Sequence, residues 1–166
     1  MTTNNFRITI IVSVPLTNKI IIKDWIDYNG HMNLSYYILV FDMGAEVILS
    51  KFQMGEQAAK TTKRSTMVVE THTNYIKEVK ESDEVIISLS HVDHDKKRLH
   101  YKLEMYERSK NILSATTEVL ALYINLDERK VSEFENEKIK IMNDYILKNN
   151  INFNQEDLKF SSKLKK

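Results

Sequence analysis

Residues 25–54 read WIDYNGHMNLSYYILVFDMGAEVILSKFQM, and this stretch decides the fold because a polar turn runs directly into a long apolar segment. From residue 33 to 54, apolar residues recur at helical spacing, at Tyr37, Val40, Phe41, Gly44, Val47, Ile48 and Phe52. Other apolar side chains fill the remaining faces, which is typical of a buried helix. Asp42, Glu46 and Lys51 make the segment too polar to span lipid. We predict one buried helix over 33–54, capped by Asn33 or Ser35.

After residue 64 the hydrophobic period changes to two, which predicts strands. Over 66–77, strict alternation gives one face with Met67, Val69, Thr71, Thr73 and Tyr75, and an opposite face with Val68, Glu70, His72, Asn74 and Ile76. Turns at 81–84, 93–96 and 107–111 separate further strands, of which the last spans 112–126. Val92 falls out of phase and indicates a β-bulge. Residues 6–26 predict one or two strands, and 135–149 an amphipathic helix followed by a polar, loosely ordered tail.

The order of these elements predicts an α+β fold, in which an antiparallel sheet wraps around one long central helix and a C-terminal helix follows. The sheet must wrap because nothing else in the chain covers a helix that is apolar on most sides. We assign 1–130 to this domain and 131–166 to the C-terminal helix and a lysine-rich tail. One sheet around one helix leaves open edges, so we expect self-association to a homodimer or homotetramer.

Composition narrows the function classes. The 166 residues suffice for one domain with a core, and a net charge of +1 argues against a nucleic-acid partner. The absence of cysteine removes disulfides, thiolate zinc sites and a cysteine nucleophile, and it fits a cytoplasmic location. No apolar run approaches the roughly 20 residues needed to span a bilayer, and the N-terminus does not read as a signal peptide.

The polar turn at 25–33 has the chemistry of a hydrolytic site. It gathers a carboxylate, two amides, an imidazole and a glycine where the helix begins. Asp27 can act as a base or nucleophile in a hydrolysis. The helix N-terminus, including Leu34, offers backbone N–H donors to an oxygen that becomes negative.

The motif Asp27-x-x-Gly30-His31-x-Asn33, followed by Tyr36 or Tyr37 and Phe41-Asp42, resembles hot-dog-fold acyl-CoA thioesterases of the 4-hydroxybenzoyl-CoA thioesterase type. The resemblance covers about residues 8–130 and includes Val69-Glu70-x-His72-x-x-Tyr75 through Asp83. The longer string at 25–33, with 96–100 and 104–106, is similar to betainyl-CoA thioesterases, including domains fused to some carnitine dehydrogenases.

This resemblance implies the hot-dog fold, an acyl-CoA substrate and a catalytic carboxylate at Asp27. Asn29 and His31 match a pattern whose members orient substrate and water. No cofactor is implied, because CoA is part of the substrate. The substrate that fits best is betainyl-CoA, and the alternatives are another short-chain or aromatic acyl-CoA, or a non-catalytic acyl-CoA or acyl-ACP binding module.

Other residues near the motif carry two readings each. Gly30 makes the turn or lets backbone approach the thioester, and Asn33 caps the helix or contacts substrate. Trp25 and Tyr36, with Tyr28 and Tyr37, could form an aromatic cage for a quaternary ammonium, or they belong to the core.

Glu70 and His72 share one face of the first strand after the helix. If that face meets the site, Glu70 is a candidate second carboxylate; otherwise the two form a solvated or dimer-facing pair. Tyr75 packs on substrate or in the core. Lys97 and Arg98, beside Lys96, bind CoA phosphates or form a solvated turn. His91, His94 and His100 show no ligand arrangement that predicts a metal.

Overall fold

The computed structural model describes residues 13–150, 153 and 157–166. Residues 6–12 of the predicted N-terminal strands lie outside the described residues. In chain order the elements are β1 (Val14–Ile20), η1 (Lys23–Trp25), α1 (Leu34–Lys51), α2 (Glu56–Thr62), β2 (Arg64–Tyr75), β3 (Glu84–His94), β4 (Arg98–Glu107), β5 (Ile112–Asn125), β6 (Lys130–Val131), α3 (Asn136–Asn149) and η3 (Ser161–Lys163).

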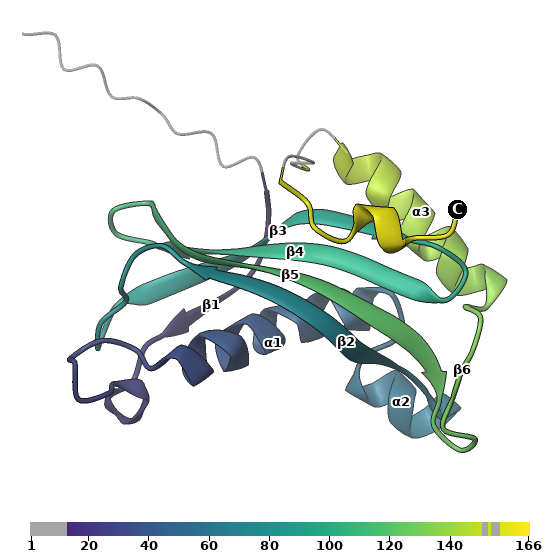
Figure 1. Cartoon of the computed structure of the whole chain (residues 1–166), viewed down its shortest axis with the longest axis horizontal. Coiled ribbons are helices and arrows are strands. Elements are labelled where there is room, and N and C mark those ends of the chain that lie inside the picture. Colours follow the sequence, from purple (N-terminus) through teal and green to yellow (C-terminus); the bar gives the residue numbers. More distant parts are fainter. Residues whose placement is uncertain (1–12, 151–152, 154–156) are drawn as a thin grey trace, which may run out of the picture.

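One antiparallel sheet, in the strand order β1-β3-β4-β5-β2 with β6 added beside β5, forms the centre of the molecule. The sheet arches over α1, and α3 and the C-terminal segment lie on its other side (Figure 1). The α+β prediction, with a sheet curled around one long helix and a C-terminal helix, is therefore confirmed.

The buried side of α1 fits closely against the sheet. Val40 and Ile48 are completely buried, and Phe41 and Ala45 nearly so. At Gly44 a Cβ atom would lie 2.5 Å from Cγ2 of Ile87 on β3, so only a glycine fits there without movement. The helix starts as predicted, because the Asn33 side chain accepts a hydrogen bond from Ser35 N at 3.0 Å.

Part of α1 and one edge of the sheet remain open. Leu34, Ile38 and Leu39 are exposed on α1. Among the described residues β2 pairs with β5 alone, so it is an edge strand, and it exposes Val68 and Val69. An edge strand beside an exposed apolar helix face is a surface that natural proteins usually cover.

A β-bulge corrects the predicted alternation along β2. The register with β5 shifts between Val68 and Glu70, so Val68 and Thr71 line the same concave face although strict alternation separates them. Two adjacent valines conceal such a shift, because either one can face the core without changing the apolar pattern. The bulge expected near Val92 is present as a register shift between Leu89 and His91.

The expectation of a loosely ordered tail is also corrected. Backbone N–H groups of Lys159 and Phe160 donate to the buried Glu118 carboxylate at 2.8 and 2.7 Å, and Glu118 also bonds His100 at 2.8 Å. The backbone N–H of Lys165 donates to Asp95 at 2.8 Å. Buried carboxylates need such donors, and the tail supplies them.

The helix α2, which its polar sequence did not predict, places Glu56 N 2.9 Å from Glu46 Oε1.

Within residues 13–150, 153 and 157–166, no helix has both the length and the hydropathy required to cross a bilayer.

Candidate active site

The polar turn forms a closed hairpin between η1 and α1. Asp27 N donates to His31 O, and Gly30 N donates to Asp27 O, both at 3.0 Å. Gly30 has a φ of 79°, in the left-handed region that glycine adopts without strain. The buried Met32 anchors the hairpin, because its N–H donates to Val79 O at 2.8 Å. The chain thus fixes Asp27 immediately before the helix.

Asp27 is partly buried, and only one of its two carboxylate oxygens is hydrogen-bonded. Its Oδ1 accepts from Asn29 N at 2.8 Å, and no other described residue hydrogen-bonds it. Asn29 therefore orients Asp27 through its backbone, while its own side chain stays exposed. A carboxylate oriented in this way keeps one oxygen available for a proton or an electrophile.

A hollow of about 220 Å³ opens beside the hairpin. Its walls include three of the predicted residues, His31, Leu34 and Tyr75, together with Met32, Tyr37, Ile76, Lys77 and Glu78. Tyr37 fixes one wall, since its hydroxyl accepts from Val79 N at 3.1 Å and its ring meets Tyr75 edge-on at 5.2 Å. Burial raises the pKa of Tyr37, so it stays a neutral phenol. Asp27 is not among the lining residues.

Leu34, the first residue of α1, lines this hollow. Ser35 N is used by the Asn33 side chain and Tyr36 N by Asn33 O. Among the described residues, Leu34 N has no hydrogen-bond acceptor. A free N–H at a helix N-terminus is suited to a developing oxyanion.

The four aromatic residues near the motif do not converge. Trp25 and Tyr36 stack on each other, with ring centroids 5.6 Å apart and planes 17° apart. The Tyr28 side chain is 97% exposed, and Tyr37 is buried in the wall of the hollow. The structure therefore does not bring these rings together around a shared space.

Glu70 and His72 lie on the other side of the sheet from α1. Glu70 pairs with Lys163 of the C-terminal segment, and His72 is in register with Glu118, whose carboxylate binds the same segment. Residues directly opposite in an antiparallel pair point to the same face. The structure therefore does not bring Glu70 and His72 to the hollow.

Lys97 and Arg98 are separated from the hairpin by the length of the sheet. They lie at the β3–β4 connection, which Figure 1 shows at the opposite end from the loop before α1. Arg98 Nη1 binds Asp95 Oδ2 at 2.8 Å, and Lys97 Nζ lies 3.6 Å from Glu133 Oε1. Both side chains therefore already form ion pairs with carboxylates of the same chain.

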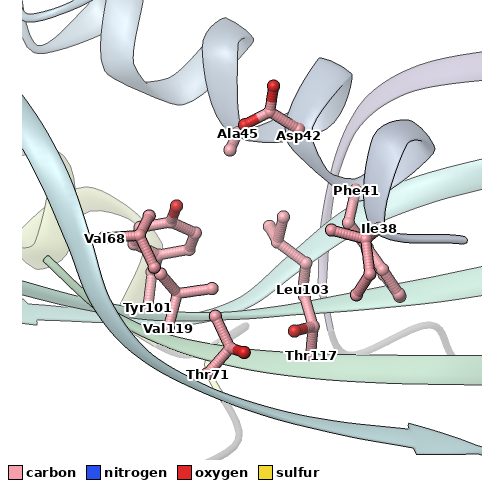
Figure 2. A pocket seen from close by; sticks show the side chains of 10 residues that line it. All are labelled: Ile38, Phe41, Asp42, Ala45, Val68, Thr71, Tyr101, Leu103, Thr117 and Val119. Carbon is pink, nitrogen blue, oxygen red and sulfur yellow. The ribbon is translucent and has the colours of Figure 1, made fainter. Parts of the chain in front are cut away.

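A second pocket, which sequence reasoning missed, lies between the middle of α1 and the concave face of the sheet (Figure 2). It has a volume of about 190 Å³ and is lined by Ile38, Phe41, Asp42, Ala45, Val68, Thr71, Tyr101, Leu103, Thr117 and Val119. The sequence did carry a signal for it, since Asp42 interrupts an apolar stripe at helical spacing with Ile38 and Ala45. Burial and the Asp42 charge both raise the pKa of Tyr101.

No group of three or more His, Cys, Asp or Glu side chains is arranged for a metal ion within the part of the chain that the structure describes.

An antiparallel sheet curled around one long helix is the hot-dog fold. Residues 22–147 match the thioesterase-like superfamily. The chain belongs to this superfamily and is a thioester hydrolase.

The relatives agree with this assignment. The betainyl-CoA thioesterase of Pseudomonas aeruginosa is 30% identical over 117 residues, which are 70% of this chain and 74% of that protein. An L-carnitine dehydrogenase/betainyl-CoA thioesterase of Rhizobium meliloti is 27% identical over 101 residues, which are 61% of this chain and 20% of that protein.

Solved structures share the fold. A hypothetical protein of Staphylococcus aureus, solved in complex with CoA, superposes with a TM-score of 0.76 at 21% identity, covering 93% of this chain and 95% of that chain.

Proposed function

We propose that this acyl-CoA thioesterase hydrolyses betainyl-CoA to betaine and CoA, with Asp27 as the catalytic carboxylate. The observation that carries the proposal is the hairpin, which holds Asp27 with one uncommitted oxygen in the loop that leads into α1. Betainyl-CoA is favoured over other acyl groups because a relative with that activity in its name is 30% identical over 70% of this chain.

The chemistry follows from the site. Asp27 either removes a proton from a water molecule that attacks the thioester carbonyl, or attacks the carbonyl itself to form an anhydride that water then hydrolyses. In both routes the carbon–sulfur bond breaks and CoA leaves as its thiol or thiolate. The carbonyl oxygen that becomes negative accepts a hydrogen bond from the free N–H of Leu34 and is stabilised by the partial positive charge of the α1 N-terminus. His31 lines the hollow beside the loop and orients water or substrate there. Nothing in this sequence of steps needs a cofactor.

We also propose that the chain forms a homodimer through β2 and the exposed face of α1. The edge strand has unpaired backbone groups, and Val68, Val69, Leu34 and Ile38 beside it are exposed. A second copy pairing antiparallel along β2 would satisfy those groups and cover those side chains.

The test is CoA release from betainyl-, acetyl-, butyryl-, benzoyl- and a long-chain acyl-CoA. We expect a preference for betainyl-CoA. Asp27→Asn should reduce turnover by about 10²- to 10⁴-fold while substrate binding persists. The matched control is Asp24→Asn, which changes an exposed acid one turn earlier in η1.

The outcomes separate the alternatives. Near-normal turnover by Asp27→Asn would overturn the catalytic assignment. A preference for a neutral ester would replace betainyl-CoA as the substrate. Binding of all esters without CoA release would favour a binding module.

A further inference from the structure

The pocket between α1 and the sheet combines one charge with apolar walls. Ile38, Asp42 and Ala45 follow one another at positions i, i+4 and i+7 and therefore share one face of α1. Figure 2 shows these helix residues opposite the strand residues across the pocket. The bulge in β2 contributes both Val68 and Thr71 to the opposite wall. Without that register shift only one of them would face the pocket.

Asp42 is the one carboxylate among the ten lining residues, and none of the ten is basic. The neighbouring acid on α1, Glu46, is used by Ser50 and by Glu56 N. Asp42 has no hydrogen bond or ion pair within the described residues. The hydroxyls of the opposite wall are partly committed, since Thr117 bonds Thr73 at 2.9 Å. The pocket therefore offers an uncommitted negative charge beside carbon surface.

We propose that this pocket binds the quaternary ammonium of the acyl group, with Asp42 as its counter-ion. A trimethylammonium carries a positive charge and has no N–H to donate. It is therefore stabilised by a nearby negative charge, methyl-sized apolar walls and an aromatic ring, here Tyr101. This proposal rests on the proposed betainyl-CoA activity and names the residue that selects its acyl group.

The pocket lies too far along α1 to serve Asp27 of the same copy. Eight residues separate Leu34 from Asp42, which is about 12 Å at 1.5 Å per residue. One methylene separates the carbonyl of betaine from its nitrogen, so the two groups cannot be so far apart. The proposal therefore places the pocket of one copy beside the hairpin of its partner. Antiparallel pairing of two β2 strands does this in the register that sets Val68 of one copy opposite Tyr75 of the other, because Tyr75 lines the hollow at the hairpin.

The experiment compares two esters of equal shape and different charge. Betainyl-CoA has a neutral isostere, 3,3-dimethylbutyryl-CoA, in which carbon replaces the ammonium nitrogen. Asp42→Asn should lower kcat/KM for betainyl-CoA by about 10- to 100-fold, mainly through KM. It should leave the neutral ester within about two-fold or improve it. Asp144→Asn, on the exposed face of α3, is the control.

An equal loss on both esters, or no loss on either, would overturn the subsite. A failure of the proposed substrate is distinguishable by a second readout, binding of tetramethylammonium chloride followed by NMR. If the wild type prefers neutral esters but binds tetramethylammonium and Asp42→Asn does not, the cation subsite stands and the betainyl assignment falls. If neither protein binds the cation and neither prefers betainyl-CoA, both proposals fall.

Discussion

Replacing Gly44 with alanine tests how closely α1 lies on the sheet. Two opposing effects act at this position. Alanine is a better helix former than glycine by about 1 kcal/mol, which favours the variant. The added Cβ, however, would lie 2.5 Å from Cγ2 of Ile87, where ordinary contacts begin near 3.4 Å. Ile87 is completely buried and β-branched, so its methyl group has no free rotamer to escape into.

The contact should win over the helix propensity. Overpacking of a well-filled core costs typically about 1–3 kcal/mol. Because the approach at Gly44 is so close, we place the cost at the upper end of that range, about 3 kcal/mol. Subtracting the propensity gain leaves a net destabilisation of about 2 kcal/mol. For a domain of this size each kcal/mol lowers Tm by about 2–4 °C, so Tm should fall by roughly 4–8 °C.

The assay is urea unfolding followed by the fluorescence of the single tryptophan, Trp25, with thermal unfolding alongside. Ile87→Ala supplies the control, because it removes the methyl group that the new Cβ meets. Alone it should destabilise by about 2–5 kcal/mol, and the double variant should be more stable than the sum of the two changes predicts. A Gly44→Ala protein that is about 1 kcal/mol more stable than the wild type would refute the close contact between α1 and β3. The gain in helix propensity would then be the only effect of the added methyl group.

Two further predictions concern the side of the sheet opposite α1. Burial, and the nearby His100, lower the pKa of His91 to about 4, whereas an unfolded histidine titrates near 6.5. Since the unfolded chain binds the extra proton first, the free energy of unfolding should be constant above pH 6.5 and fall by up to about 3 kcal/mol as the pH drops toward 4. Urea titrations at pH 7, 5.5 and 4.5 measure the free energy of unfolding at each pH. In a His91→Leu protein this free energy should fall less between pH 7 and 4.5 than in the wild type. An equal fall in the two proteins would contradict the assignment to His91. Glu118→Ala removes the acceptor of Lys159 N and Phe160 N, so trypsin should cleave the C-terminal segment faster than in the wild type while the sheet core resists. Equal cleavage rates in the two proteins would show that Glu118 does not hold this segment.

The parts of the fold that depend on local patterns could be predicted from the sequence. Helix α1 needs only its own periodicity and Asn33, and both are local. Pairing partners distant in sequence could not be foreseen. Glu118 meets its tail amides more than 40 positions away, and nothing near it in the sequence indicates a buried acceptor. The polar segment that forms α2 depends on Glu46, ten residues earlier, to bind Glu56 N.

The candidate site divides in the same way. The hairpin residues were found because they are consecutive, and His31, Leu34 and Tyr75 do meet at one hollow. Glu70 and His72 were drawn into the prediction by their spacing, but spacing alone does not say which face of a strand looks toward α1. Asp42 was quoted as part of a motif and not as a site residue, because the pocket it enters is closed by strands that follow much later in the chain.

Val79 uses both of its backbone groups to hold the site, since its N–H reaches the Tyr37 hydroxyl and its carbonyl receives Met32 N. At this position the main chain makes the hydrogen bonds that place the hairpin, while the buried side chain packs in the core. Replacing the valine with another apolar residue of similar size should therefore keep the hairpin in place. A proline there, or a change in the number of residues between β2 and β3, would move the hairpin relative to α1.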